Sequence, residues 1–116
     1  MKVLKVVLLS VLALSLIFSF AFAAGDVTKG KALFNDPKFA GGTAEKSCNS
    51  CHQDGKGLEK AGMKKEFNIM GEKQMSLEEA VNLCIVNANK GKAIDPKSED
   101  MANVVAYIKS LMPKKK

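Results

Sequence analysis

The 116-residue sequence has no tryptophan and no arginine, and it contains one histidine and one tyrosine. All 18 of its basic residues are lysines. Nucleic-acid-binding domains spread lysine and arginine as a basic stripe over the fold. Here three of the excess positive charges come from the lysines at positions 114–116, at the very end of the chain. We therefore expect no nucleic-acid partner.

The first 23 residues differ in composition from the rest. Lys2 and Lys5 make a basic start, the stretch from 6 to 20 is apolar apart from three serines, and Ala21 and Ala23 are the small residues that a signal peptidase needs. We expect residues 1–23 to be a secretory signal peptide whose cleavage releases the protein into the periplasm without a membrane anchor. The alternative is an uncleaved anchor helix, because the apolar run approaches the length of a membrane span.

The remaining chain is short and poor in large aromatic side chains. We expect it to form one domain, residues 24–113, followed by a basic tail, residues 114–116. A domain of this size buries a modest fraction of its surface and commonly needs a disulfide, a metal or another staple. A large apolar cofactor would supply the core that the side chains do not.

Apolar periodicity predicts three main helices and no strand, which gives an all-α fold class. Val27, Leu33 and Phe34 repeat at helical spacing in the first segment. The sequence from Ser76 to Glu79 is a capping box that opens the second helix, and Pro96 and Ser98 precede the third. Residues 58–75 have no sustained period, and we expect a loop with local turns there.

Cys48-Asn49-Ser50-Cys51-His52 is a C-x-x-C-H haem-attachment motif. Two thiols three positions apart project from one helical turn toward the two vinyl groups of a haem, with which they form thioethers. His52 then lies beneath the porphyrin, where its imidazole binds the iron as the proximal axial ligand. We expect one covalently attached haem c per chain, held by Cys48, Cys51 and His52.

Three other interpretations of the motif compete with haem. A C-x-x-C redox pair is typical of a βαβ setting, which a chain of helices and loops does not offer. A zinc site needs about four nitrogen or sulfur ligands, and Cys84 is the only other cysteine. A structural disulfide between Cys48 and Cys51 leaves both His52 and the export signal unexplained.

With this motif in place, the chain from 25 to 111 resembles a small class I cytochrome c. Proteins of that family cross an N-terminal helix carrying a glycine and an aromatic residue, here Gly30 and Phe34, over a C-terminal helix carrying a tyrosine, here Tyr107. A middle helix, matched by residues 76–90, covers the other face of the haem. The resemblance implies a small cytochrome c fold with three main helices around a covalently bound haem.

The sixth iron ligand departs from the class I pattern, because residues 89–96 contain no methionine or histidine. The favoured candidate is Cys84, which shares the apolar face of the middle helix with Val81 and Ile85. The alternative is Met101, inside the last helix. The choice affects the reduction potential, because a thiolate stabilises Fe(III) and a thioether stabilises Fe(II). An open sixth position also remains, as do four further candidates: Met63, Met70, Lys90 and Lys92.

A second resemblance concerns residues 77–84, 89–93, 98–101 and 106–108, which are similar to the haem domains of bacterial thiosulfate dehydrogenases and related sulfur-oxidation cytochromes. The resemblance implies that Cys84 ligates iron, as the corresponding cysteine does in those proteins. This chain lacks the Arg-Ser-type sequence that follows the cysteine in that family, and it shows no second haem domain.

From these features we expect a periplasmic one-electron carrier that cycles Fe(III) and Fe(II) between redox partner proteins and is not an enzyme. Four lysines after the motif are predicted to surround an exposed haem edge and to guide acidic partners to it: Lys56, Lys60, Lys64 and Lys65. The alternatives are a haem subunit or enzyme of sulfur-compound oxidation, and a haem sensor that binds small ligands.

Overall fold

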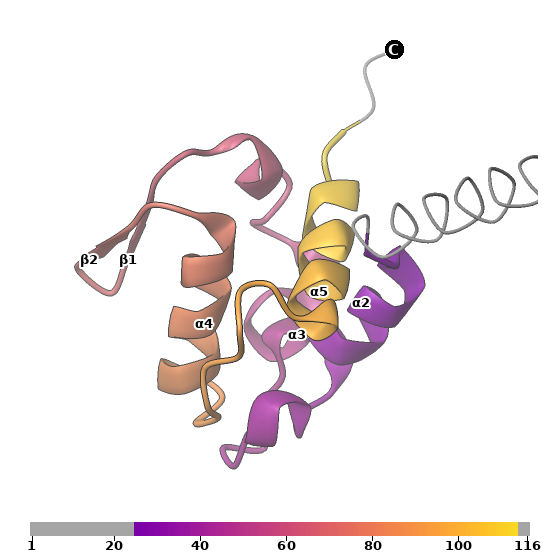
Figure 1. Cartoon of the computed structure of the whole chain (residues 1–116), viewed down its shortest axis with the longest axis vertical. Coiled ribbons are helices and arrows are strands. Elements are labelled where there is room, and N and C mark those ends of the chain that lie inside the picture. Colours follow the sequence, from indigo (N-terminus) through magenta and orange to yellow (C-terminus); the bar gives the residue numbers. More distant parts are fainter. Residues whose placement is uncertain (1–24, 114–116) are drawn as a thin grey trace, which may run out of the picture.

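The computed structural model describes residues 25–113, which form helices and one small sheet (Figure 1). The predicted signal peptide, residues 1–23, and the basic tail, residues 114–116, lie outside the described residues. Within the described part, no helix combines the length and apolarity needed to cross a membrane. The elements in chain order are α2 (Val27–Asn35), η1 (Phe39–Gly41), α3 (Cys48–Cys51), η2 (Gln53–Gly55), η3 (Ala61–Met63), β1 (Phe67–Ile69), β2 (Glu72–Gln74), α4 (Leu77–Asn87) and α5 (Glu99–Ser110).

The first and last helices of the described part, α2 and α5, pack side by side (Figure 1). Gly30 is buried at their crossing, and a Cβ atom there would collide with the backbone carbonyl of Asn103. One turn further along, the rings of Phe34 and Tyr107 meet edge to face with their centroids 5.0 Å apart. The helix crossing expected from the cytochrome c resemblance is therefore confirmed.

Side-chain caps begin the three main helices as the sequence predicts. The Asp26 carboxylate accepts a hydrogen bond from the Lys29 N–H, and the Ser98 hydroxyl accepts one from the Met101 N–H. The Ser76 hydroxyl accepts the Glu79 N–H at 3.1 Å. The Glu79 carboxylate, however, accepts from the N–H of Met75 and not from that of Ser76, so the capping box forms in one direction only.

The prediction of an all-α fold is wrong in one segment, because residues 67–74 form an antiparallel hairpin of β1 and β2. Met70 (φ 53°) and Gly71 (φ 81°) both adopt the left-handed conformation, as a two-residue type I′ turn requires. Each strand has only three residues, too few for a visible alternation, and methionine is an unusual residue at the first turn position. The expected loop is thus a short sheet in an otherwise helical fold.

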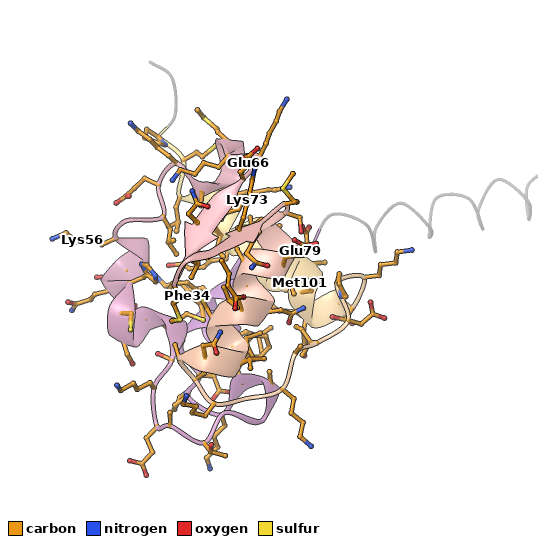
Figure 2. All side chains as sticks on the ribbon, turned by 90° about the vertical axis from the view of Figure 1, so that its left-hand side faces the viewer. Phe34, Lys56, Glu66, Lys73, Glu79 and Met101 are labelled. Atoms are coloured by element: carbon orange, nitrogen blue, oxygen red, sulfur yellow. The ribbon has the colours of Figure 1, made fainter. Side chains whose placement is uncertain are left out.

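The protein core lies where α5 meets α2 and α4. Its most deeply buried side chains come from all three helices, and α4 contributes Ile85, which is completely buried. Figure 2 shows Phe34 and Met101 in the interior of the molecule. The other large side chains of this core are Phe39, Val81 of α4, and Val104, Val105, Tyr107 and Ile108 of α5.

Candidate haem site

A cavity of about 810 Å³ opens beside this core. Its volume lies within the roughly 300–1,000 Å³ that small-molecule and cofactor sites usually occupy. The walls are mainly apolar and come from α2, from the segment after the motif, from the hairpin and from the inner faces of α4 and α5. The apolar residues that line it are Phe34, Leu58, Ala61, Phe67, Ile69, Met70, Leu77, Ala80, Val81, Val104 and Ile108.

The two motif cysteines lie at the ends of the one-turn helix α3. The Cys48 carbonyl accepts the His52 N–H at 2.9 Å, which closes this turn. Cys48 is half-buried and lines the cavity, whereas Cys51 is exposed and does not line it. Both are free thiols in the structure, so both sulfur atoms are available for thioether formation.

The His52 ring lines the cavity, and its Nδ1 lies 3.1 Å from the Lys56 carbonyl oxygen. A carbonyl can only accept a hydrogen bond, so Nδ1 carries a proton in this contact, and the tautomer of the neutral ring that makes it has its lone pair on Nε2. The tight turn of η2 holds this carbonyl in place, since the Gly55 N–H donates to the His52 carbonyl and the Lys56 N–H to that of Gln53. His52 is thus set in the tautomer and orientation that a metal-binding imidazole needs.

Cys84 lies half-buried on α4 and lines the same cavity as His52. Burial raises the pKa of the Cys84 thiol above its ordinary value, and the neighbouring Cys51 raises it further. Such a thiol stays neutral until a nearby cation favours the thiolate, as a bound iron would. The structure therefore brings the favoured sixth-ligand candidate into the cavity that holds the proximal one.

The other sixth-ligand candidates lie in different surroundings. Met101 is completely buried in the protein core and is not among the residues that line the cavity. Met70, at the hairpin tip, lines the cavity although 68% of it is exposed. Met63, Lys90 and Lys92 are exposed and do not line it. The identity of the ligand stays a prediction, with Cys84 and Met70 as the candidates inside the cavity.

Sequence reasoning missed two groups that position the motif. One is the Lys56 carbonyl, a backbone atom that no side-chain pattern reveals. The other is Asn89, which is almost completely buried after the end of α4. Its backbone carbonyl accepts the N–H groups of Thr43 and Ala44, and its amide donates to the Cys48 sulfur at 4.0 Å. This contact partly offsets the effect of burial, which raises the pKa of the Cys48 thiol.

The donor set of this cavity fits a haem c. It combines apolar walls on several sides, a thiol in the wall and a second on the same turn, and an imidazole whose Nε2 is free for iron. A helical shell around such a cavity, with C-x-x-C-H at its edge, defines a c-type cytochrome domain.

Comparison with known proteins identifies the family of c-type cytochrome domains to which the chain belongs. The profile of the family described as SoxA/TsdA, cytochrome c domain, matches residues 29–113. The chain belongs to this family, and a cytochrome c domain implies covalently bound haem. The predicted resemblance to sulfur-oxidation cytochromes is confirmed.

Two curated relatives bear the name L-cysteine S-thiosulfotransferase subunit SoxA. The protein of Chlorobaculum thiosulfatiphilum is 44% identical over 86 residues, and that of Chlorobaculum tepidum is 42% identical over 86 residues. Each alignment covers 74% of this chain and 28% of the relative, so the chain spans less than a third of the relatives' length. No solved structure gave a significant match.

These relatives correct one expectation from the sequence. We expected a protein that is not an enzyme, because the chain showed no catalytic constellation beyond the haem motif. Both relatives are named as subunits of an enzyme, so that expectation is wrong.

Proposed function

We propose that this chain is the haem-carrying part of an enzyme that oxidises sulfur compounds in the periplasm. The observation that carries the proposal is the position of Cys84 in the wall of the cavity that His52 also lines, in a chain 44% identical to part of SoxA. The activity named for the relatives acts on cysteine sulfur, and Cys84 offers a cysteine sulfur beside the cofactor. This proposal replaces the free electron carrier that we first expected.

In this proposal Cys48 and Cys51 attach one haem c, and His52 directs Nε2 at the iron while the Lys56 carbonyl holds Nδ1. When bound, the haem supplies one-electron chemistry through its iron. With a haem in the cavity, the apolar walls would limit the access of water to the space beside Cys84. In such a low-dielectric space, charge on the Cys84 sulfur interacts more strongly with its surroundings than it would in water.

Cys84 is proposed as the sixth ligand in the resting protein. A thiolate at the iron favours Fe(III) and lowers the reduction potential. Because the relatives are named as subunits, we also propose that further protein segments or subunits complete the enzyme and exchange electrons with this domain. The predicted signal peptide supports the periplasmic location.

The test uses holoprotein made in a host with haem-attachment machinery. The ferric protein is treated with thiosulfate, a poor haem ligand, without oxygen while its absorption spectrum is recorded. We expect a spectral change in the wild type and in Met101→Leu, a core substitution outside the cavity, but none in Cys84→Ser. Dithionite should reduce all three, which shows that each haem remains active in electron transfer.

The opposite result would favour the electron carrier. A wild-type protein whose spectrum does not change with thiosulfate, but which exchanges electrons reversibly with a protein donor, would contradict the proposed role in sulfur oxidation.

A further inference from the structure

The cavity has two cationic side chains in its wall, Lys60 and Lys64, among otherwise mainly apolar residues. The chain has no arginine and no tryptophan, and its one tyrosine, Tyr107, packs against Phe34 away from the cavity. The only histidine has its Nδ1 engaged by a carbonyl. Lysine is therefore the cation that this chain can offer to an anionic group at the cavity.

Both lysines are fixed by one compact turn. Lys60 immediately precedes η3 and Lys64 immediately follows it. The Met63 N–H donates to the Lys60 carbonyl at 3.1 Å, and the Lys64 N–H donates to the carbonyl of the buried Ala61 at 3.3 Å. Because η3 also packs against α5, the two lysine backbones are held at a constant separation beside the cavity.

Neighbouring acidic groups within the described residues do not form ion pairs with these lysines. Glu66 pairs with Lys73 at 3.2 Å, and Figure 2 shows the two side chains together at the hairpin. Glu59 also lines the cavity, but its carboxylate accepts the Gly57 N–H at 3.0 Å. Hydrogen bonds from its own backbone and from Gly57 lower the pKa of the Glu59 carboxyl, so Glu59 is a carboxylate and the wall carries one negative charge against the two positive charges of the lysines. Within residues 25–113, neither Lys60 nor Lys64 forms an ion pair.

We propose that Lys60 and Lys64 bind the two propionate carboxylates of the haem. The inference rests on the haem-binding part of the proposed function and not on the sulfur chemistry. Haem is an apolar plate with two carboxylates on one edge, and this cavity is lined mainly by apolar residues, with Lys60 and Lys64 close together in one stretch of the lining. Ion pairs beside an apolar wall are screened less than pairs in open water, so each lysine stabilises an ionised propionate.

In this proposal the two lysines are positioning residues: they hold the propionates, and their positive charge affects the reduction potential of the iron. Positive charge near the iron favours Fe(II) over Fe(III), because the reduced centre carries one positive charge less. Replacing either lysine by a neutral side chain should therefore lower the midpoint potential.

The test measures the midpoint potential of purified holoprotein at one pH and one ionic strength. We expect Lys60→Gln and Lys64→Gln each to lower it, the double variant to lower it further, and Lys64→Arg to restore it. The matched control is Lys65→Gln, which removes the same charge from a neighbouring exposed lysine outside the cavity wall. In resonance Raman spectra, the propionate bending band should shift in the two cavity variants and stay in place in the control.

Two outcomes would overturn the inference. Equal shifts of potential in all three single variants, with an unmoved propionate band, would mean that the lysines act only as surface charge. An unchanged potential together with a lost spectral response to thiosulfate would mean that the lysines bind a free anion. No sulfur compound is present when the midpoint potential is measured. A holoprotein that does not react with thiosulfate can therefore still show the expected shifts of potential. Failure of the proposed sulfur chemistry can thus be told apart from failure of the proposed propionate binding.

Discussion

Cys48 and Cys51 decide whether this chain retains its cofactor. Thioethers are not released by acid-acetone extraction, so haem should remain with the wild-type polypeptide. We expect Cys48→Ala or Cys51→Ala to reduce the holoprotein yield sharply, since each removes one of the two covalent links. Intact mass spectrometry gives the measurement. A wild-type mass equal to that of the bare polypeptide, after expression with haem-attachment machinery, would show that the motif does not bind haem covalently.

Cys84 and Met101 can be distinguished by spectroscopy. We expect Cys84→Ser to convert the ferric haem from low spin toward high spin and to raise its potential, because an anionic ligand that stabilises Fe(III) is lost. Met101→Leu should keep the ligand and cost about 1 kcal/mol in packing, as a near-isosteric core substitution does. A methionine–iron charge-transfer band that survives Cys84→Ser and disappears in Met101→Leu would reverse the assignment.

At the residue scale, candidate haem-binding side chains could be predicted where their spacing along the chain forms a recognisable motif. The C-x-x-C-H motif identified Cys48, Cys51 and His52, and the apolar face of the middle helix brought Cys84 to the cavity. The Lys56 carbonyl was missed because its role depends on the path of the backbone. The cavity position of Met70 was equally hidden, because it depends on a hairpin that the sequence did not reveal.

The α2–α5 crossing depends on the absence of a side chain at Gly30. In an isolated helix, Gly30→Ala would favour helix formation by about 1 kcal/mol. Here we expect a net loss of about 1–3 kcal/mol or more, because the added Cβ meets the Asn103 backbone, which cannot move aside as a flexible side chain can. Guanidinium unfolding of the holoprotein measures the change. The control Lys31→Ala, on the exposed face of α2, should stay within about 0.5 kcal/mol, and a stabilised Gly30→Ala would contradict the close crossing.

At the hairpin turn, in contrast, we expect a substitution that stabilises the protein. Met70 adopts a positive φ that asparagine tolerates better, so Met70→Asn should stabilise the holoprotein by a few tenths of a kcal/mol up to about 1 kcal/mol. The ferric spectrum should not change if Cys84 is the ligand. Thermal unfolding and absorption spectroscopy check both points. Loss of the low-spin spectrum in Met70→Asn would identify Met70 as the sixth ligand.

Helices were predicted better than the sheet for a physical reason. A capping residue marks the start of each main helix: Asp26, Ser76 or Ser98. Apolar residues repeated at helical spacing mark its buried face. The three-residue strands carry neither signal, and their pairing depends on packing against α4. Local patterns therefore predicted the helical part of the fold and missed the element that depends on tertiary contacts.

On the scale of the whole molecule, the cavity of about 810 Å³ is large for so small a domain. Folded domains are stable by only about 5–15 kcal/mol, which is too little to keep apolar walls of this extent open to water. We expect apoprotein from a host without haem attachment to show no cooperative thermal transition by circular dichroism, in contrast to the holoprotein. A sharp transition in the apoprotein would show that the polypeptide folds without its cofactor.

The contact between α2 and α5 also affects the order in which parts of the chain fold. The Asp26 N–H donates to the side chain of Asn103, a residue 77 positions later in the chain. Such a distant pairing forms slowly compared with local turns such as those around Cys48, because a long loop must close first. A chain that emerges N-terminus first cannot form this pairing until its last helix has been released. During that interval the segment at 48–52 remains accessible, which gives a haem-attaching enzyme time to act before folding encloses the thiols.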